Sequence, residues 1–124
     1  MGTRCSVFAV GTSPAGLRRT EAQVRELAAR LTRFDPDSEL SRFNAAAGDW
    51  VSVSPELESL LRESLRAFDM SAGLVNVAVL PAMVAIGYSR RLADGPTAAS
   101  PGLAHSAPPL PDVLEVAVGK ARLA

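Results

Sequence analysis

Three carboxylates stand close together in the sequence and are the first candidates for chemistry. Asp35, Asp37 and Glu39 lie in the stretch "RFDPDSELSRFNAAAGDW", residues 33–50. Oxygen ligands at this density are typical of calcium or magnesium sites. The calcium-loop pattern also needs a Gly and a later Glu at fixed spacing, and neither occurs here. We therefore expect a solvated acidic turn and predict no metal ligand in this chain.

Other reactive side chains are few. His105 is the only histidine, and it lies in a Pro-rich stretch without an apparent Ser or Cys partner, so we expect a surface residue rather than a general base. Cys5 is the only cysteine and lies in an apolar run, which favours a small buried side chain over a catalytic thiol. Neither of the common Gly-rich phosphate loops is present, and no Cys or His spacing suits zinc. We assign no catalytic residue.

The composition limits the function classes. The formal net charge is zero, which argues against a nucleic acid or another polyanion as the main partner. The apolar fraction of 48% argues against disorder over most of the chain. No unbroken apolar run approaches the length of a membrane span. No signal peptide is visible, which favours a cytoplasmic protein.

The elements that position these residues begin with a predicted strand over residues 3–10, which is rich in β-forming residues. A helix is predicted over residues 14–33, because four apolar residues recur at helical spacing. Pro36 ends it, and a turn with a short helical segment follows over residues 38–47. The four apolar positions are Val24, Leu27, Ala28 and Leu31.

The second half contains the strongest helix signal. A short strand over residues 50–54 leads into a helix capped by Ser54, started by Pro55 and ended at Gly73. Another helix runs from about Val79 to Gly87. A flexible Pro/Ala-rich connection is expected over residues 89–112, and a hairpin turning at residues 119–120 closes the chain.

These elements predict an α+β fold with two long helices packed on a mostly antiparallel sheet. The predicted strands are too few to complete a sandwich. We therefore expect the chain to be the front part of a larger domain.

The aromatic residues around the polar turn leave two interpretations open. Phe34, Phe43 and Trp50 either fasten a loop to the core or line a pocket. For Trp50 the fastening role is favoured.

Four stretches, in this order, resemble the ApbE family, the FAD:protein FMN transferases. The resemblance covers only the N-terminal portion of such an enzyme and implies a T-fold-like domain. It implies an enzyme that binds FAD with Mg²⁺ and transfers FMN to a Thr or Ser hydroxyl of an acceptor flavoprotein, releasing AMP. The stretches are "MGT" (1–3), "RFDPDSELSRFNAAAG" (33–48), "VSVSPELESLL" (51–61) and "SAGLVNVAVLPAMVAIGY" (71–88).

The resemblance also implies which residues contact FAD. Met1 and Phe34 match positions that contact the flavin or adenine part. The segment Leu74, Val75 and Asn76 matches one that contacts FAD through its backbone and an acidic side chain. Two further residues, Ser38 and Asn44, would brace the pocket.

The chain also departs from the family pattern. Relatives carry D-P-T where this sequence has Asn76, Val77 and Ala78, and nothing in residues 92–124 matches the later Gly-rich and metal-binding motifs. We therefore expect the Mg²⁺ ligands in a missing C-terminal part and no transferase activity from this chain alone. A non-catalytic flavin-binding or protein-interaction module remains an alternative, as does a fragment without independent function.

Overall fold

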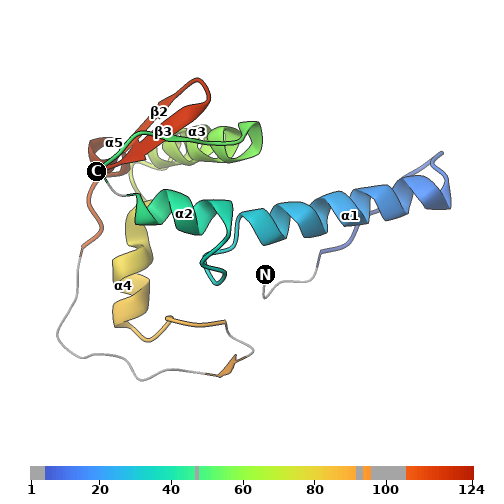
Figure 1. Cartoon of the computed structure of the whole chain (residues 1–124), viewed down its shortest axis with the longest axis horizontal. Helices are drawn as coiled ribbons and strands as arrows, with labels where there is room; N and C mark the ends of the chain where they lie inside the picture. The colour runs from blue at the N-terminus through green and yellow to red at the C-terminus, as the bar shows by residue number, and fades with distance from the viewer. Residues whose placement is uncertain (1–4, 47, 92–93, 96–105) are drawn as a thin grey trace.

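The computed structural model describes residues 5–46, 48–91, 94–95 and 106–124, and has helices around a small antiparallel sheet, as expected for an α+β protein (Figure 1). The helices are α1 (Pro14–Arg30), α2 (Glu39–Ala45), α3 (Pro55–Met70), the 3-10 helix η1 (Val77–Val79), α4 (Leu80–Ala85) and α5 (Leu110–Val113). The strands are β1 (Val51–Ser52), β2 (Leu114–Ala117) and β3 (Lys120–Leu123).

The sheet has the order β1-β3-β2, so the last strand in the sequence lies in the centre. Val51 pairs with Ala121, and Leu114 pairs with Leu123. The predicted hairpin is confirmed, but its turn lies one residue earlier than expected, at residues 118–119. Gly119 has a φ of +70°, a conformation that glycine adopts without steric cost.

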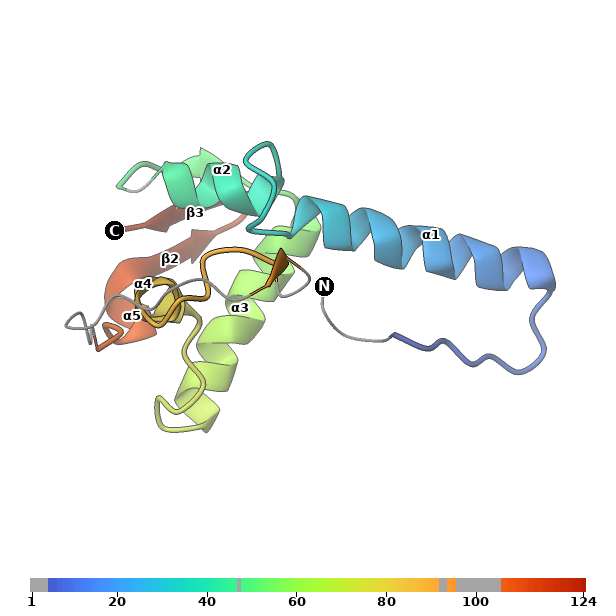
Figure 2. The same ribbon diagram turned by 90° about the horizontal axis from the view of Figure 1, so that it is seen from below.

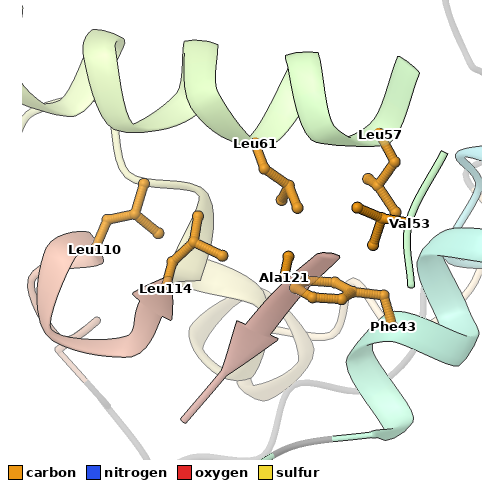
Figure 3. Close-up of a cluster of buried hydrophobic side chains, with 7 residues drawn as sticks. All are labelled: Phe43, Val53, Leu57, Leu61, Leu110, Leu114 and Ala121. Atoms are coloured by element: carbon orange, nitrogen blue, oxygen red, sulfur yellow. The ribbon is translucent and has the colours of Figure 1, made fainter. Parts of the chain in front are cut away.

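The core lies between α3 and the sheet (Figure 3). Leu57 and Leu61 point from α3 toward Ala121 of β3 because they are one helical turn apart. Leu57 is completely buried. Among the described residues, the buried apolar ones are Phe43, Val53, Leu57, Leu61, Leu110, Leu114 and Ala121.

The core includes Leu110, which lies near the end of residues 89–112, where a flexible connection was expected. Leu110 starts α5 and is only 1% exposed. In the sequence, a leucine directly after two prolines is typical of a linker. In the structure, Leu110 lies in α5, which packs beside α3 and β2. The middle of that segment, with His105, lies outside the described residues.

Serine caps fix where the main helices begin. The hydroxyl oxygens of Ser13, Ser38 and Ser54 each accept a hydrogen bond from the backbone N–H three residues later. Such a side chain satisfies one of the N–H groups that a helix start leaves unpaired. The predicted start of α3, with Ser54 as cap and Pro55 in the first position, is confirmed.

Only one of the two long helices packs on the sheet. α1 extends away from the rest of the molecule (Figures 1 and 2) and contains no buried residue, and Leu27 is 41% exposed. Leu31, just beyond its end, contacts the core cluster. Because no residue of α1 is buried, the predicted packing of the first helix on the sheet is wrong.

The predicted strand over residues 3–10 is also wrong for its described part. Residues 5–10 have no strand assignment and are exposed, including Cys5, for which we expected burial. Phe8 is 93% exposed. High β propensity forms a strand only where a neighbouring strand supplies backbone partners and packing, and these residues have neither.

No helix within the described parts of the chain is both long and apolar enough to cross a membrane.

Candidate functional site

An aromatic and cationic cluster lies where the loop after α1 meets the segment after α4. The Phe34 and Tyr88 rings are nearly perpendicular, with centroids 5.9 Å apart. The Arg33 guanidinium carbon lies 4.2 Å from the Phe34 ring centroid and 4.5 Å from that of Tyr88. Arg33 Nη2 also donates a hydrogen bond of 2.6 Å to the Tyr88 carbonyl oxygen. Together these contacts hold Arg33 in one place between two rings.

The loop that carries Phe34 is fixed by its own polar residues. Phe34 N donates to Thr32 Oγ1 at 3.2 Å, and Asp37 N donates to Asp35 Oδ1 at 2.9 Å. The Ser38 hydroxyl donates to the Thr32 carbonyl oxygen. These short-range bonds stabilise the turn in place of a continued helix.

An open cavity of about 310 Å³ lies beside this cluster. Its size is at the lower end of the range for small-molecule sites. It offers an aromatic surface, three guanidinium groups and a single carboxylate. The lining residues are Arg33, Phe34, Pro36, Ser89, Arg90, Arg91 and Asp94.

A second and larger cavity, of about 640 Å³, lies between α2 and β1. Three of its polar residues, Arg30, Glu39 and Ser54, are bonded to one another. Glu39 accepts hydrogen bonds from Ser54 N at 2.6 Å, from Ser54 Oγ at 2.8 Å and from Arg30 at 3.0 Å. Arg30 also reaches Glu56 at 3.3 Å. We interpret this network as a structural connection between α1, α2 and α3.

The pKa of Glu39 reflects this network. Burial by itself raises the pKa of the carboxyl group. The hydrogen bonds from Ser54 and the nearby Arg30 charge act in the opposite direction, and on balance they lower the pKa below its ordinary value. Glu39 is therefore a charged structural group.

The two residues expected to brace the pocket do not line the cavity beside Phe34, although the Ser38 hydroxyl donates to the Thr32 carbonyl oxygen in the Phe34 loop. Ser38 is buried and caps α2 through Ser41 N. Asn44 is half-buried on α2, next to the core residue Phe43. The prediction for Met1 lies outside the described residues.

The segment expected to complete the pocket lies away from Phe34. Leu74 is 91% exposed, and Val75 is also exposed. Asn76 Oδ1 accepts from Ala78 N at 2.9 Å, and Asn76 Nδ2 donates to the Pro108 carbonyl oxygen at 2.8 Å. This segment precedes η1 and α4, whereas Tyr88 follows them. α4 alone spans about 9 Å, so the two predicted halves of the site are at opposite ends of a helix.

Sequence reasoning missed Arg33 and Tyr88. The hydrogen bond between them joins residues 55 positions apart, and no local sequence pattern predicts such a contact. The one available signal is the position of Arg33 next to Phe34.

Trp50 lines neither of the two cavities. Trp50 is 41% exposed, with Lys120 Nζ 5.2 Å and the Arg122 guanidinium carbon 5.4 Å from its ring centroid. It therefore lies near two cations of β3, neither of which belongs to the buried core cluster.

The described residues do not fit the Mg²⁺ ion that the family resemblance implies. Across residues 5–46, 48–91, 94–95 and 106–124, no three His, Cys, Asp or Glu side chains are close enough to hold a metal ion together. Asp35 and Asp37 are both exposed, and Glu39 is occupied by Arg30 and Ser54.

The sequence model of the ApbE family matches residues 1–119, which is most of the chain. No curated protein and no solved structure matches it. The match agrees with the resemblance carried by the four stretches in the sequence and associates the protein with flavin chemistry. The chain therefore belongs to the ApbE family.

Proposed function

We propose that the protein binds FAD and serves in FMN transfer to an acceptor flavoprotein. In this reaction a Thr or Ser hydroxyl of the acceptor attacks the phosphorus of the FMN part of FAD. A new oxygen–phosphorus bond forms, the bond to the bridging diphosphate oxygen breaks, AMP leaves, and the hydroxyl loses its proton. Membership of the ApbE family supports this proposal at the level of flavin chemistry.

The single structural observation that supports FAD binding is the Phe34 cluster. Phe34 is half-buried, next to Tyr88, and lines a cavity. A ring that is fixed by its neighbours loses little entropy when a planar ligand stacks on it. Arg33 contacts one face of the ring, and we propose that a flavin or adenine ring takes the other.

FAD can reach both predicted contact regions because it is an extended molecule with a ring system at each end. We propose that one end lies at Phe34, while the other extends along α4 toward the backbone of residues 74–76. Asn76 would then act as a positioning residue, because its amide fixes the start of η1.

The contribution that we assign to this chain is binding and orientation. The described residues gather no set of three possible metal ligands, and nothing in residues 92–124 matches the later Gly-rich and metal-binding motifs of the family. We therefore expect the purified chain alone to bind FAD without turning it over.

A non-catalytic flavin-binding module is the second candidate, and the contacts of Asn76 favour it. Both ends of its amide are used within the chain, on Ala78 N and the Pro108 carbonyl oxygen. An acidic side chain here would lose the donor to Pro108. FAD binding that persists when a complementing part of the family domain is supplied, still without transfer, would favour this candidate.

The first experiment is a titration of FAD with the purified chain, followed by flavin fluorescence. We expect saturable quenching for the wild type and a roughly 5- to 150-fold weaker affinity for Phe34→Ala, since stacking on an aromatic ring contributes about 1–3 kcal/mol. Phe8→Ala is the matched control, because Phe8 is exposed and lies outside both cavities. Absence of FAD binding by the folded wild type, or equal affinities for Phe34→Ala and Phe8→Ala, would refute the proposal.

A further inference from the structure

Three arginines converge on the cavity beside Phe34 against a single opposing carboxylate. Arg33, Arg90 and Arg91 line it together with Asp94. The protein as a whole has thirteen basic and thirteen acidic residues, so this local excess of positive charge does not follow from a basic composition. A concentration of guanidinium groups in a concave surface attracts anions.

Arg33 is held ready for such a ligand. Two rings and the Tyr88 carbonyl oxygen fix its guanidinium group, and among the described residues this carbonyl is its one hydrogen-bond acceptor. A guanidinium group has five N–H donors, so most of them remain for a ligand. A preorganised donor pays less entropy on binding than a mobile one.

Arg90 and Arg91 approach from the segment after α4. Both are exposed, and the turn that carries them is closed by a 2.9 Å hydrogen bond from Asp94 N to the Arg91 carbonyl oxygen. Arg91 makes no side-chain hydrogen bond or ion pair with any residue that the structure describes. Its charge is therefore directed to solvent at the rim of the cavity.

We propose that Arg33, Arg90 and Arg91 bind the diphosphate group of a nucleotide whose ring stacks on Phe34. Guanidinium groups bind phosphate oxygens through pairs of charge-assisted hydrogen bonds, and two linked phosphates provide enough oxygens for more than one arginine. The inference rests on the proposed function where the ligand is FAD, whose two halves are joined by a diphosphate. It extends that function by assigning the anionic middle of the ligand to a named set of residues.

The test uses isothermal titration of the full chain with inorganic pyrophosphate, ADP and adenosine. We expect pyrophosphate and ADP to bind, with affinities that fall as salt rises, and adenosine to bind at least tenfold more weakly than ADP. The double variant Arg90→Ala/Arg91→Ala should lose at least tenfold in affinity for pyrophosphate. Asp94→Asn should bind pyrophosphate more tightly than the wild type, because it removes a repulsive charge.

Arg66→Ala is the matched control, since Arg66 is exposed on α3 and lines neither cavity. Unchanged pyrophosphate affinity in the double variant, or equal losses in Arg66→Ala, would overturn the proposal. Both substituted arginines are exposed, so the variants are expected to fold, and circular dichroism checks this.

Titration of the same variants with FAD separates this inference from the proposed function. Normal FAD binding by the double variant would refute the diphosphate site and leave the proposed function standing. Arginine-dependent pyrophosphate binding without any FAD binding would support the diphosphate site and refute the proposed function.

Discussion

Glu39 shows how a single residue can connect three helices. It occupies the first position of α2, binds Arg30 at the end of α1, and accepts two hydrogen bonds from Ser54, the cap of α3. Its side chain is only 15% exposed. A shielded carboxylate with this many donors is stabilised in its charged form. The Glu of the "SELSRFN" stretch therefore connects the helices on either side of the Phe34 loop, and it does not line the cavity beside Phe34.

Glu39→Gln should reduce the free energy of unfolding by about 1.5–3 kcal/mol at pH 7, since hydrogen bonds to a charged group are lost. The folded pKa of Glu39 lies below the unfolded value of about 4.3, so this stability is present above that value and is lost as the pH falls through the folded pKa. The difference between wild type and variant should therefore shrink in strongly acidic solution. Urea denaturation followed by Trp50 fluorescence measures it.

Glu63→Gln provides the control for this experiment. Glu63 forms an exposed pair with Arg66, so the change should cost less than about 1 kcal/mol. A difference between wild type and Glu39→Gln that grew toward acidic pH would contradict the assigned role.

At the scale of elements, the sequence predicts what depends on neighbouring residues. Ser54 and Pro55 correctly mark the start of α3, and the helical spacing of apolar residues correctly predicts that a helix begins at residue 14. Partners distant in the sequence are not predictable in this way. Glu26 lies one helical turn before Arg30, at a spacing that allows an ion pair. Arg30 instead pairs with Glu39 and Glu56 on other helices.

In the candidate site, too, local sequence patterns identify some residues, and contacts between distant parts of the sequence bring in the others. Phe34 could be identified because its surrounding stretch is recognisable, whereas Tyr88 and the basic pair after it come from a segment that local patterns describe only as the end of a helix. The separation of Phe34 from residues 74–76 depends on the direction of α4, which no sequence pattern determines.

The end of α3 offers a prediction about an element. Ala72 has a φ of +51°, and the hydrogen bonds from Ala72 N to the Asp69 carbonyl oxygen and from Gly73 N to that of Phe68 form a Schellman motif. Glycine is usual at the position of Ala72. Ala72→Gly should therefore raise the free energy of unfolding by up to about 1 kcal/mol, after allowance for the greater entropy of unfolded glycine.

Gly73→Ala is the contrasting variant. Gly73 has a φ of +85°, and a Cβ there would lie 3.4 Å from Phe68 Cζ, so this change should destabilise the protein by about 1 kcal/mol or more. Thermal denaturation of both variants compares the two positions. A loss of stability in Ala72→Gly equal to that in Gly73→Ala would contradict this account.

At the scale of the whole molecule, stability depends on a small core, which has seven buried apolar residues in the part of the chain that the structure describes. Leu57 lies completely inside it, whereas Leu60 on the same helix is 45% exposed. Because folded domains are stabilised by only about 5–15 kcal/mol in total, losing one central side chain is a large perturbation.

Leu57→Ala should reduce the free energy of unfolding by about 3–5 kcal/mol, through lost burial and the cavity left behind. Leu60→Ala should cost less than about 1 kcal/mol, because its side chain is partly solvated already. Urea denaturation of the two variants gives the comparison. Similar losses at both positions would show that the core is not centred where α3 meets β3.

β3 is the central strand of the sheet, although it is the last strand in the sequence. A ribosome releases α3 well before it releases the strand that α3 covers. Until residues 120–123 emerge, β1 and β2 have no strand between them, and Leu57 and Leu61 have no β3 beneath them. The sheet therefore forms only after residues 120–123 have emerged, and until then the nascent chain exposes an apolar helix face that a chaperone can bind.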